Sequence, residues 1–146
     1  MKTIFVLLAI AIFLTPFEAS SRNTRHLLSI DKAIQSPDFV SHLDTDIALY
    51  FSDQKHPELT RSLGYFNSNK KTNAFNKSDT EACQWVFLSA LLSLQARARK
   101  EGANAVINIV SYYKKKIYKS DSQFECHAGV IMAGVALRGE MVRVAK

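Results

Sequence analysis

The stretch Ser78–Gly102, SDTEACQWVFLSALLSLQARARKEG, decides the fold because it carries the start, the buried face and the end of one long helix. Ser78 followed three residues later by Glu81 fits a capping box, which satisfies free N–H groups of a first helical turn. Apolar residues then recur at the i, i+3, i+4, i+7 spacing of a helix with one buried face. They are Ala82, Cys83, Val86, Phe87, Ala90, Leu91, Leu94 and Ala98. We therefore predict a helix over Ser78–Glu101, about 35 Å long at a rise of about 1.5 Å per residue.

This helix ends in a glycine turn beside a basic cluster, a combination that could suggest a phosphate site. Gly102 follows the last periodic residue and is well placed for the left-handed conformation that ends many helices. Phosphate binds at helix N-termini, where free N–H groups point outward, whereas the free carbonyls here carry negative partial charge. We therefore interpret the turn as a helix stop. We expect three basic side chains to bind its carbonyls: Arg97, Arg99 and Lys100.

Segments on either side of the helix have the residue pattern of strands. Asp46–Pro57 alternates apolar with small or polar residues, and Ser62–Phe75 begins as a weaker strand that becomes an Asn/Lys-rich loop. Ala105–Tyr113 and Phe124–Gly139 are rich in apolar residues, and Glu140–Val144 adds a short last strand. We predict an α+β fold, with an antiparallel sheet of about four strands packed on the long helix in the order β-β-α-β-β.

The first 21 residues have the layout of a secretory signal peptide. Lys2 precedes an apolar run, Ile4–Leu14, which is followed by small residues. That run is too short to span a bilayer, which needs roughly 20 apolar residues. We predict cleavage after Ser21 or after Ala19, export to the periplasm or the medium, no transmembrane anchor, and a single domain over residues 22–146.

The chain has two cysteines, Cys83 and Cys126. An even count in an exported protein favours one disulfide. Such a bridge would close a loop of about 44 residues and contribute on the order of 4 kcal/mol in the chain-entropy model. Free buried thiols, a redox pair, or a metal site that uses His127 are alternatives, but the spacings typical of the last two do not occur. We predict a structural Cys83–Cys126 disulfide and no metal site.

The chain is basic, with 19 Lys and Arg against 13 Asp and Glu and a formal net charge of +6. Without the predicted signal peptide the balance is 18 to 12, so the surplus belongs to the exported part. Basic side chains in exposed settings could bind an anion, or they could only solubilise the chain and protect strand ends from pairing. The candidates are Lys70, Lys71, Lys114, Lys115, Lys116 and Lys119.

Motifs of catalysis are few. Gly134–Met141, GVALRGEM, has the glycine spacing of a Walker A loop, but Glu140 and Met141 stand at its lysine and hydroxyl positions, so we predict no nucleotide binding. No G-x-S-x-G or H-E-x-x-H occurs, and the four histidines are scattered. Asp53 and His56 could form a small polar site, although turn chemistry explains them better. We predict no catalytic residue, no cofactor and no metal.

Three segments carry a resemblance to a known family: LYFSDQKHP (Leu49–Pro57), NKKTNAFNKSDTEACQWVFLSALLSLQARARKEGANAVINIVSYYKK (Asn69–Lys115) and FECHAGVIMAGVALRG (Phe124–Gly139). They resemble small exported proteobacterial proteins that are often labelled "excinuclease ATPase subunit". The chain lacks the nucleotide and zinc motifs which that label requires, so we expect neither activity. The helix, turn and following strand also look loosely like the YbjQ-type domain and the Rcs stress-sensor lipoprotein, both small α+β folds. No site residue is carried over from them.

Taken together, these patterns predict an exported, non-catalytic protein that binds a ligand or associates with the cell envelope. We expect an anionic envelope component or another protein as partner, rather than a nucleotide or nucleic acid. An unrecognised envelope hydrolase or redox enzyme is one alternative, because catalytic sites need not be local in sequence. A secreted factor that acts on a host is another.

Overall fold

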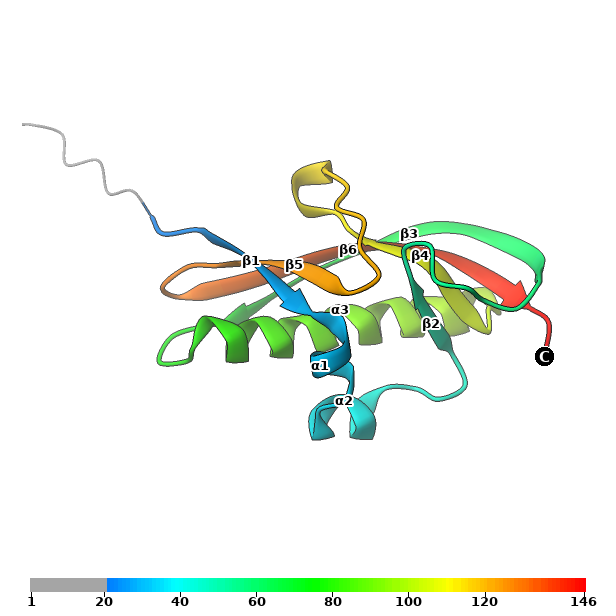
Figure 1. Cartoon of the computed structure of the whole chain (residues 1–146), viewed down its shortest axis with the longest axis horizontal. Coiled ribbons are helices and arrows are strands. Elements are labelled where there is room, and N and C mark those ends of the chain that lie inside the picture. The colour runs from blue at the N-terminus through cyan, green and yellow to red at the C-terminus, as the bar shows by residue number, and fades with distance from the viewer. Residues whose placement is uncertain (1–20) are drawn as a thin grey trace, which may run out of the picture.

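The computed structural model describes residues 21–146, so the predicted signal peptide lies outside the described residues except for Ser21. Six strands form one curled, half-barrel sheet, and one long helix packs against one of its faces (Figure 1). The strands are β1 (Thr24–Ser29), β2 (Ala48–Phe51), β3 (Leu59–Asn73), β4 (Ala105–Ser111), β5 (Gln123–Ala128) and β6 (Met132–Val144). The helices are α1 (Ile30–Ile34), α2 (Pro37–His42), α3 (Asp79–Glu101) and the 3-10 helix η1 (Tyr113–Lys115).

The sheet is organised around β6. Along one edge β6 pairs antiparallel with β3, from Met132 opposite Asn73 to Val144 opposite Leu59. Along its other edge, the first residues of β6 pair with β5 and the later ones with β4. β1 extends the sheet beyond β5, and β2 extends it beyond β4. With partners on both edges, β6 is buried along most of its length.

The long helix α3 begins and ends where the sequence predicts. The Ser78 hydroxyl oxygen accepts a hydrogen bond from the Glu81 N–H at 3.1 Å. Gly102 ends the helix with φ 77°, in the left-handed region that favours glycine. The predicted apolar stripe is buried against the sheet, and the buried face also includes Leu88 and Gln95.

The arginines near the end of α3 bind side chains, so the prediction that they bind the terminal carbonyls is wrong. Arg97 pairs with Glu101 at 2.9 Å, and its guanidinium lies 4.0 Å from the ring centroid of Phe66. Arg99 pairs with Asp44, which lies on a distant segment of the chain. The arginines bind carboxylates instead of helix carbonyls because charge-assisted hydrogen bonds are stronger than those to neutral carbonyls.

The α+β class is confirmed, but the sheet is mixed and six-stranded rather than antiparallel with about four strands in the order β-β-α-β-β. The sequence of β1 alternates weakly, and this edge strand takes its place from its pairing with β5. β2 runs parallel to β4. Parallel strands need a long crossover connection, and β3 with α3 supplies it.

The segment Phe124–Gly139 is a hairpin and not the single long strand that we predicted. β5 ends at Ala128 and β6 begins at Met132. The turn between them contains Val130 and Ile131, which are 62% and 63% exposed. Their β-branched side chains have strand propensity, so the residue pattern does not predict a turn here.

β3 continues to Asn73 through the stretch that we predicted to be a loop. Lys70 and Lys71 therefore lie in an edge strand, opposite Val135 and Gly134 of β6. The side chains of this stretch are mostly exposed, so they lack the alternation of a half-buried strand. Lysines in such a position also discourage pairing with a second sheet.

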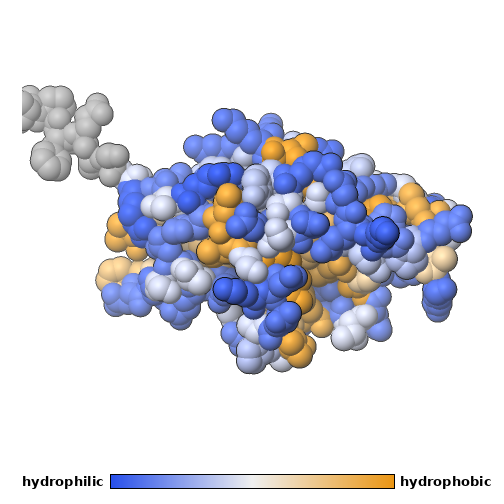
Figure 2. Space-filling view, in the orientation of Figure 1, coloured by the Kyte–Doolittle hydropathy of each residue, from blue (hydrophilic) through white to orange (hydrophobic). Residues whose placement is uncertain are grey.

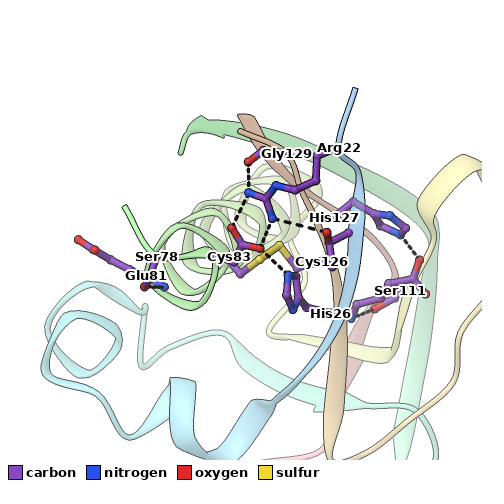
Figure 3. The surroundings of a disulfide bond; sticks show 12 residues. Arg22, His26, Ser78, Glu81, Cys83, Ser111, Cys126, His127 and Gly129 are labelled. Atoms are coloured by element: carbon purple, nitrogen blue, oxygen red, sulfur yellow. Dashed lines mark hydrogen bonds and ion pairs between the residues drawn. A yellow bond between two sulfur atoms is a disulfide. The ribbon is translucent and has the colours of Figure 1, made fainter. Parts of the chain in front are cut away.

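The main core lies between α3 and the sheet, and a disulfide ties the two together. Cys83 of α3 and Cys126 of β5 are both fully buried, and their Cα atoms are 5.8 Å apart (Figure 3). The predicted bridge is thereby confirmed, and the alternative of free thiols is wrong. Disulfides of this kind persist in oxidising compartments, which is consistent with the predicted export.

Candidate functional site

The face of the sheet opposite α3 carries most of the polar side chains of the sheet. Alternation along β6 places Ala133, Val135 and Leu137 against the helix, each 1% exposed. The same alternation places Arg138 and Glu140 on the opposite face. Ionisable side chains that gather on one sheet face make that face the first place to look for a ligand site.

One segment crosses this polar face. After β4 the chain rises on the side opposite α3, forms η1 and returns to β5 (Figure 1). The Tyr112 N–H donates a hydrogen bond to the Ala136 carbonyl at 2.8 Å, which ties the segment to β6. Lys114 and Lys115 take φ values of 49° and 61°, in the left-handed region that non-glycine residues seldom occupy. Two hollows border this segment.

The larger one, which we call the hairpin hollow, has a volume of about 590 Å³. Its lining includes residues 129–134, from the β5–β6 turn and the start of β6, together with Arg22, Lys71, Tyr113 and His127. Figure 2 shows apolar surface at the end of the molecule where this turn lies. The hairpin hollow therefore combines an apolar wall with basic and aromatic side chains.

Arg22, which lines the hairpin hollow, belongs to an ion-pair cluster (Figure 3). Arg22 binds the Asp79 carboxylate at 2.7 Å and the Gly129 carbonyl at 2.8 Å. His26 Nε2 lies 2.8 Å from the same carboxylate. Hydrogen bonds from Arg22 and His26 lower the pKa of Asp79 to about 2. A Cβ atom at Gly129 would lie 2.8 Å from the Arg22 carbonyl oxygen, so this close approach requires glycine.

A second cluster surrounds His127. Its Nε2 lies 2.7 Å from Glu125 Oε1, and its ring stacks on Tyr113 with the centroids 3.5 Å apart. Arg25 also binds Glu125, at 2.9 Å. Burial alone would raise the pKa of Glu125, but hydrogen bonds from His127 and Arg25 outweigh it and lower that pKa. His127 Nδ1 is buried and has no hydrogen-bond partner among the described residues.

Two of the lysines that the sequence singled out are related to the hairpin hollow, one directly and one through Tyr113. Lys71 of β3 lines the hairpin hollow. Lys114 Nζ lies 5.5 Å from the ring centroid of Tyr113, which lines the same hollow. No sequence signal joins these two lysines, since the order of the strands in the sheet decides their neighbourhood.

The other candidate lysines are placed elsewhere. Lys119 pairs with Asp53 at 3.4 Å and lines the second hollow. Lys70 alternates with Lys71 along β3 and so points to the other face of that strand. Four of the six line neither of these hollows: Lys70, Lys114, Lys115 and Lys116, of which Lys114 lies over the ring of Tyr113.

The second hollow, which we call the arginine hollow, has a volume of about 380 Å³. Its lining residues are Tyr65, Asn108, Val110, Ile117, Lys119 and Arg138. They come from β3, β4, β6 and the segment that crosses the polar face. Only Lys119 among them is a candidate from the sequence, because a hollow assembled from four segments leaves no local pattern.

Beside the arginine hollow lies an almost buried carboxylate. Glu140 is 9% exposed and accepts hydrogen bonds from the Ser62 hydroxyl at 2.6 Å and from the Asn108 amide at 3.2 Å. Its hydrogen bond with Tyr65 raises the pKa of that phenol. Asn108 takes φ 51° at a register shift between β4 and β6, so its backbone is strained where it presents this amide.

The other sequence candidates do not form a site. His56 Nδ1 donates to the Pro57 carbonyl at 2.8 Å, and Asp53 pairs with Lys119 instead of His56. These two residues therefore do not pair with each other. Within residues 21–146, no group of three or more His, Cys, Asp or Glu side chains is arranged to hold a metal ion.

Comparison with known proteins does not assign this chain to a family. No family model matches the chain, and no curated protein matches its sequence. None of the helices in the described part of the chain is long and apolar enough to cross a membrane.

Proposed function

We propose that the protein is an exported, non-catalytic binding protein that holds an anionic amphiphile of the cell envelope in the hairpin hollow. The observation that carries this proposal is an apolar turn that shares a hollow with Lys71 and with Tyr113, over whose ring Lys114 lies. Val130 and Ile131 supply an apolar wall, while Lys71 and Lys114 make no ion pair with any described residue. An acyl chain would lie along the wall, and its acidic headgroup would lie near the lysines.

The acids around the hairpin hollow leave this positive charge in place. Asp79 is bound by Arg22, and Glu125 is bound by Arg25. Each of these arginines neutralises one carboxylate, so the lysines set the sign of the remaining charge. A ligand held in this way binds more weakly as salt is added, because screening shortens the reach of exposed charges.

Export rests on three supports of different kinds. The first residues of the chain predict a signal peptide. The Cys83–Cys126 bridge fits an oxidising compartment. The resemblance to small exported proteobacterial proteins points the same way. We expect exported protein to have an intact mass that starts at Ser20 or Arg22, and a retained Met1 would contradict export.

A hydrolase is the second candidate function. In many hydrolases a histidine acts as the catalytic base and a carboxylate orients it, and His127 and Glu125 form a pair of this kind. The position of His127 Nδ1, the nitrogen that does not contact Glu125, argues against hydrolysis. His127 Nδ1 is buried, and the ring of Tyr113 covers one face of the imidazole. A base must lie within hydrogen-bond reach of the proton that it removes. We therefore favour binding over hydrolysis, and we expect neither ATPase nor excinuclease activity.

Calorimetric titration with dodecyl phosphate, below its critical micelle concentration, tests the proposal. Dodecyl maltoside is the uncharged control ligand with the same chain. The double variant Lys71→Gln/Lys114→Gln should bind dodecyl phosphate more weakly by about tenfold or more, because a hydrogen bond to a charged group contributes roughly 1.5–3 kcal/mol. The matched control Lys70→Gln/Lys115→Gln removes the same charge outside the hollow and should bind like the parent.

Three outcomes would contradict the proposal. One is equal binding of the phosphate and the maltoside, which would leave only the apolar wall. Another is an equal loss in both double variants, which would indicate the net charge rather than the hairpin hollow. The third is dodecyl phosphate binding that does not change with salt.

A further inference from the structure

Arg138 stands out among the arginines because its guanidinium has no partner. Five other arginines bind a carboxylate or a carbonyl: Arg22, Arg25, Arg97, Arg99 and Arg143. Within residues 21–146, no atom accepts a hydrogen bond from Arg138, although its side chain is half-buried on β6. The one other arginine without a partner in this range, Arg61, is exposed, so water satisfies it.

Two tyrosine rings hold this guanidinium in place. Its central carbon lies 4.8 Å from the ring centroid of Tyr65 and 5.4 Å from that of Tyr112. Tyr65 comes from β3, and Tyr112 comes from the segment that follows β4. A guanidinium that stacks on aromatic faces keeps its N–H groups free for other partners. The side chain is therefore held in position while its donors remain unused.

The nearest acid along β6 does not take these donors. Glu140 lies two residues from Arg138 on the same face, but Ser62 and Asn108 donate to its two oxygens at 2.6 Å and 3.2 Å. The Asn108 amide reaches the carboxylate from a backbone in the left-handed region. Glu140 and Arg138 thus remain apart, although an ion pair between neighbouring opposite charges would be the simplest arrangement.

A cavity and a second cation lie next to the free donors. Arg138 and Lys119 both line the arginine hollow, of about 380 Å³, whose apolar wall comes from Val110 and Ile117. Lys119 pairs with Asp53 at 3.4 Å, and the Asp53 side chain is 83% exposed. Exposed pairs of this kind contribute little, so Lys119 can exchange this partner for a ligand.

We propose that the arginine hollow binds an oxyanion, a carboxylate or a phosphate, of a small ligand. Arg138 makes the principal contact, because its planar donors match the two oxygens of such a group. Lys119 supplies the second positive charge, and Tyr65 and Ile117 flank the organic part of the ligand. This site is separate from the hairpin hollow and does not depend on the function proposed for it.

Titration of the ¹⁵N-labelled protein with phenyl phosphate and with benzoate, followed by NMR, tests the site. Benzyl alcohol has the same ring without the charge and is the control ligand. We expect saturable shifts of the Arg138 Nε–H signal with at least one of the two anions and none with the alcohol. Comparison of phenyl phosphate with benzoate identifies which oxyanion the site prefers.

Three variants separate this site from the net charge and from the fold. Arg138→Gln should weaken binding by tenfold or more, and Arg138→Lys should weaken it less, because a lysine keeps the charge but loses the planar pair of donors. The matched control Arg61→Gln removes the same charge from an exposed position and should bind like the parent. Lys71→Gln/Lys114→Gln should also leave this binding unchanged, whatever it does at the hairpin hollow.

The proposal would be overturned by an Arg138 Nε–H signal that stays in place with both anions. Equal losses in Arg138→Gln and Arg61→Gln would overturn it as well, since they would indicate non-specific attraction. The signal of the parent protein provides this test even if a variant at Arg138 does not fold. Lys119→Gln, at an exposed side chain, provides a second test and should weaken binding without lowering the melting temperature.

Discussion

Phe87 of α3 stacks face to face on Phe124 of β5, with the ring centroids 3.8 Å apart and the planes 4° from parallel. Cys83 and Cys126 form the disulfide one helical turn away along α3 and two residues away along β5. The two spacings match, because four helical residues rise about 6 Å and two strand residues about 6.6 Å. A covalent bond and an aromatic stack therefore join the same face of the helix to the same face of the strand.

Replacement of one ring should be costly. Phe124→Ala should lower the free energy of unfolding by about 3–5 kcal/mol, because Phe124 is 1% exposed and its removal leaves a cavity against Phe87. Urea denaturation followed by circular dichroism measures the change. Phe75 is 59% exposed and is the matched control. Phe75→Ala should cost about 0.5 kcal/mol or less. Equal costs in the two variants would show that the stack does not hold α3 on the sheet.

Removal of the disulfide should have an effect of similar size. Cys83→Ala/Cys126→Ala should lower the free energy of unfolding by about 4 kcal/mol, because the unfolded chain regains the freedom of the loop between the two cysteines. A reductant should lower the stability of the parent protein toward that of the variant and should leave the variant unchanged. A parent protein whose urea midpoint is unaffected by complete reduction would contradict this expectation.

The Asp79 cluster should make stability depend on acid pH. Its folded pKa of about 2 lies below the ordinary value of 3.8, so its contribution is fully present above about pH 4 and is lost as the pH falls through 2. Urea midpoints measured from pH 6 to pH 2 should fall more for the parent than for Asp79→Asn. Glu125 also has a lowered pKa and contributes in the same direction, so only the difference between the two proteins reports on Asp79. Parallel curves would rule out this role.

The end of α3 should depend on the left-handed conformation of Gly102. A Cβ atom at this position would meet no atom within 4 Å, so the cost of Gly102→Ala is backbone strain alone. We expect a loss of roughly 1–2 kcal/mol in the free energy of unfolding. Gly102→Asn should cost less, because asparagine tolerates this region better than alanine does. If alanine and asparagine cost the same, the strain does not come from the backbone.

The features that could be predicted from the sequence are those with a local physical cause. The start and end of α3 depend on Ser78 and Gly102, each of which acts within a few residues of itself. The buried stripe of the helix follows from a spacing of 3.6 residues per turn. The partner of Cys83 was predictable for a different reason, since the chain contains only one other cysteine.

The features that could not be predicted depend on pairing between distant segments. β1 is a strand because β5 pairs with it, and the Asn/Lys-rich end of β3 is a strand because β6 pairs with it. The turn at Val130 and Ile131 has the residues of a strand, so it is recognised only from the structure, where the chain reverses direction between β5 and β6. The parallel arrangement of β2 and β4 follows from the crossover through α3, and no residue within either strand encodes it.

Both hollows belong to this second group. The sequence determined that the chain is basic and that some lysines are exposed, because charge and polarity are properties of single residues. Only the tertiary structure decided that Lys71 lines the hairpin hollow with Tyr113, over whose ring Lys114 lies, and that Arg138 lies between two tyrosines with its donors unused. The physical reason is that the strand order of the sheet, and the segment that crosses its polar face, place these side chains together across separations of more than 20 residues.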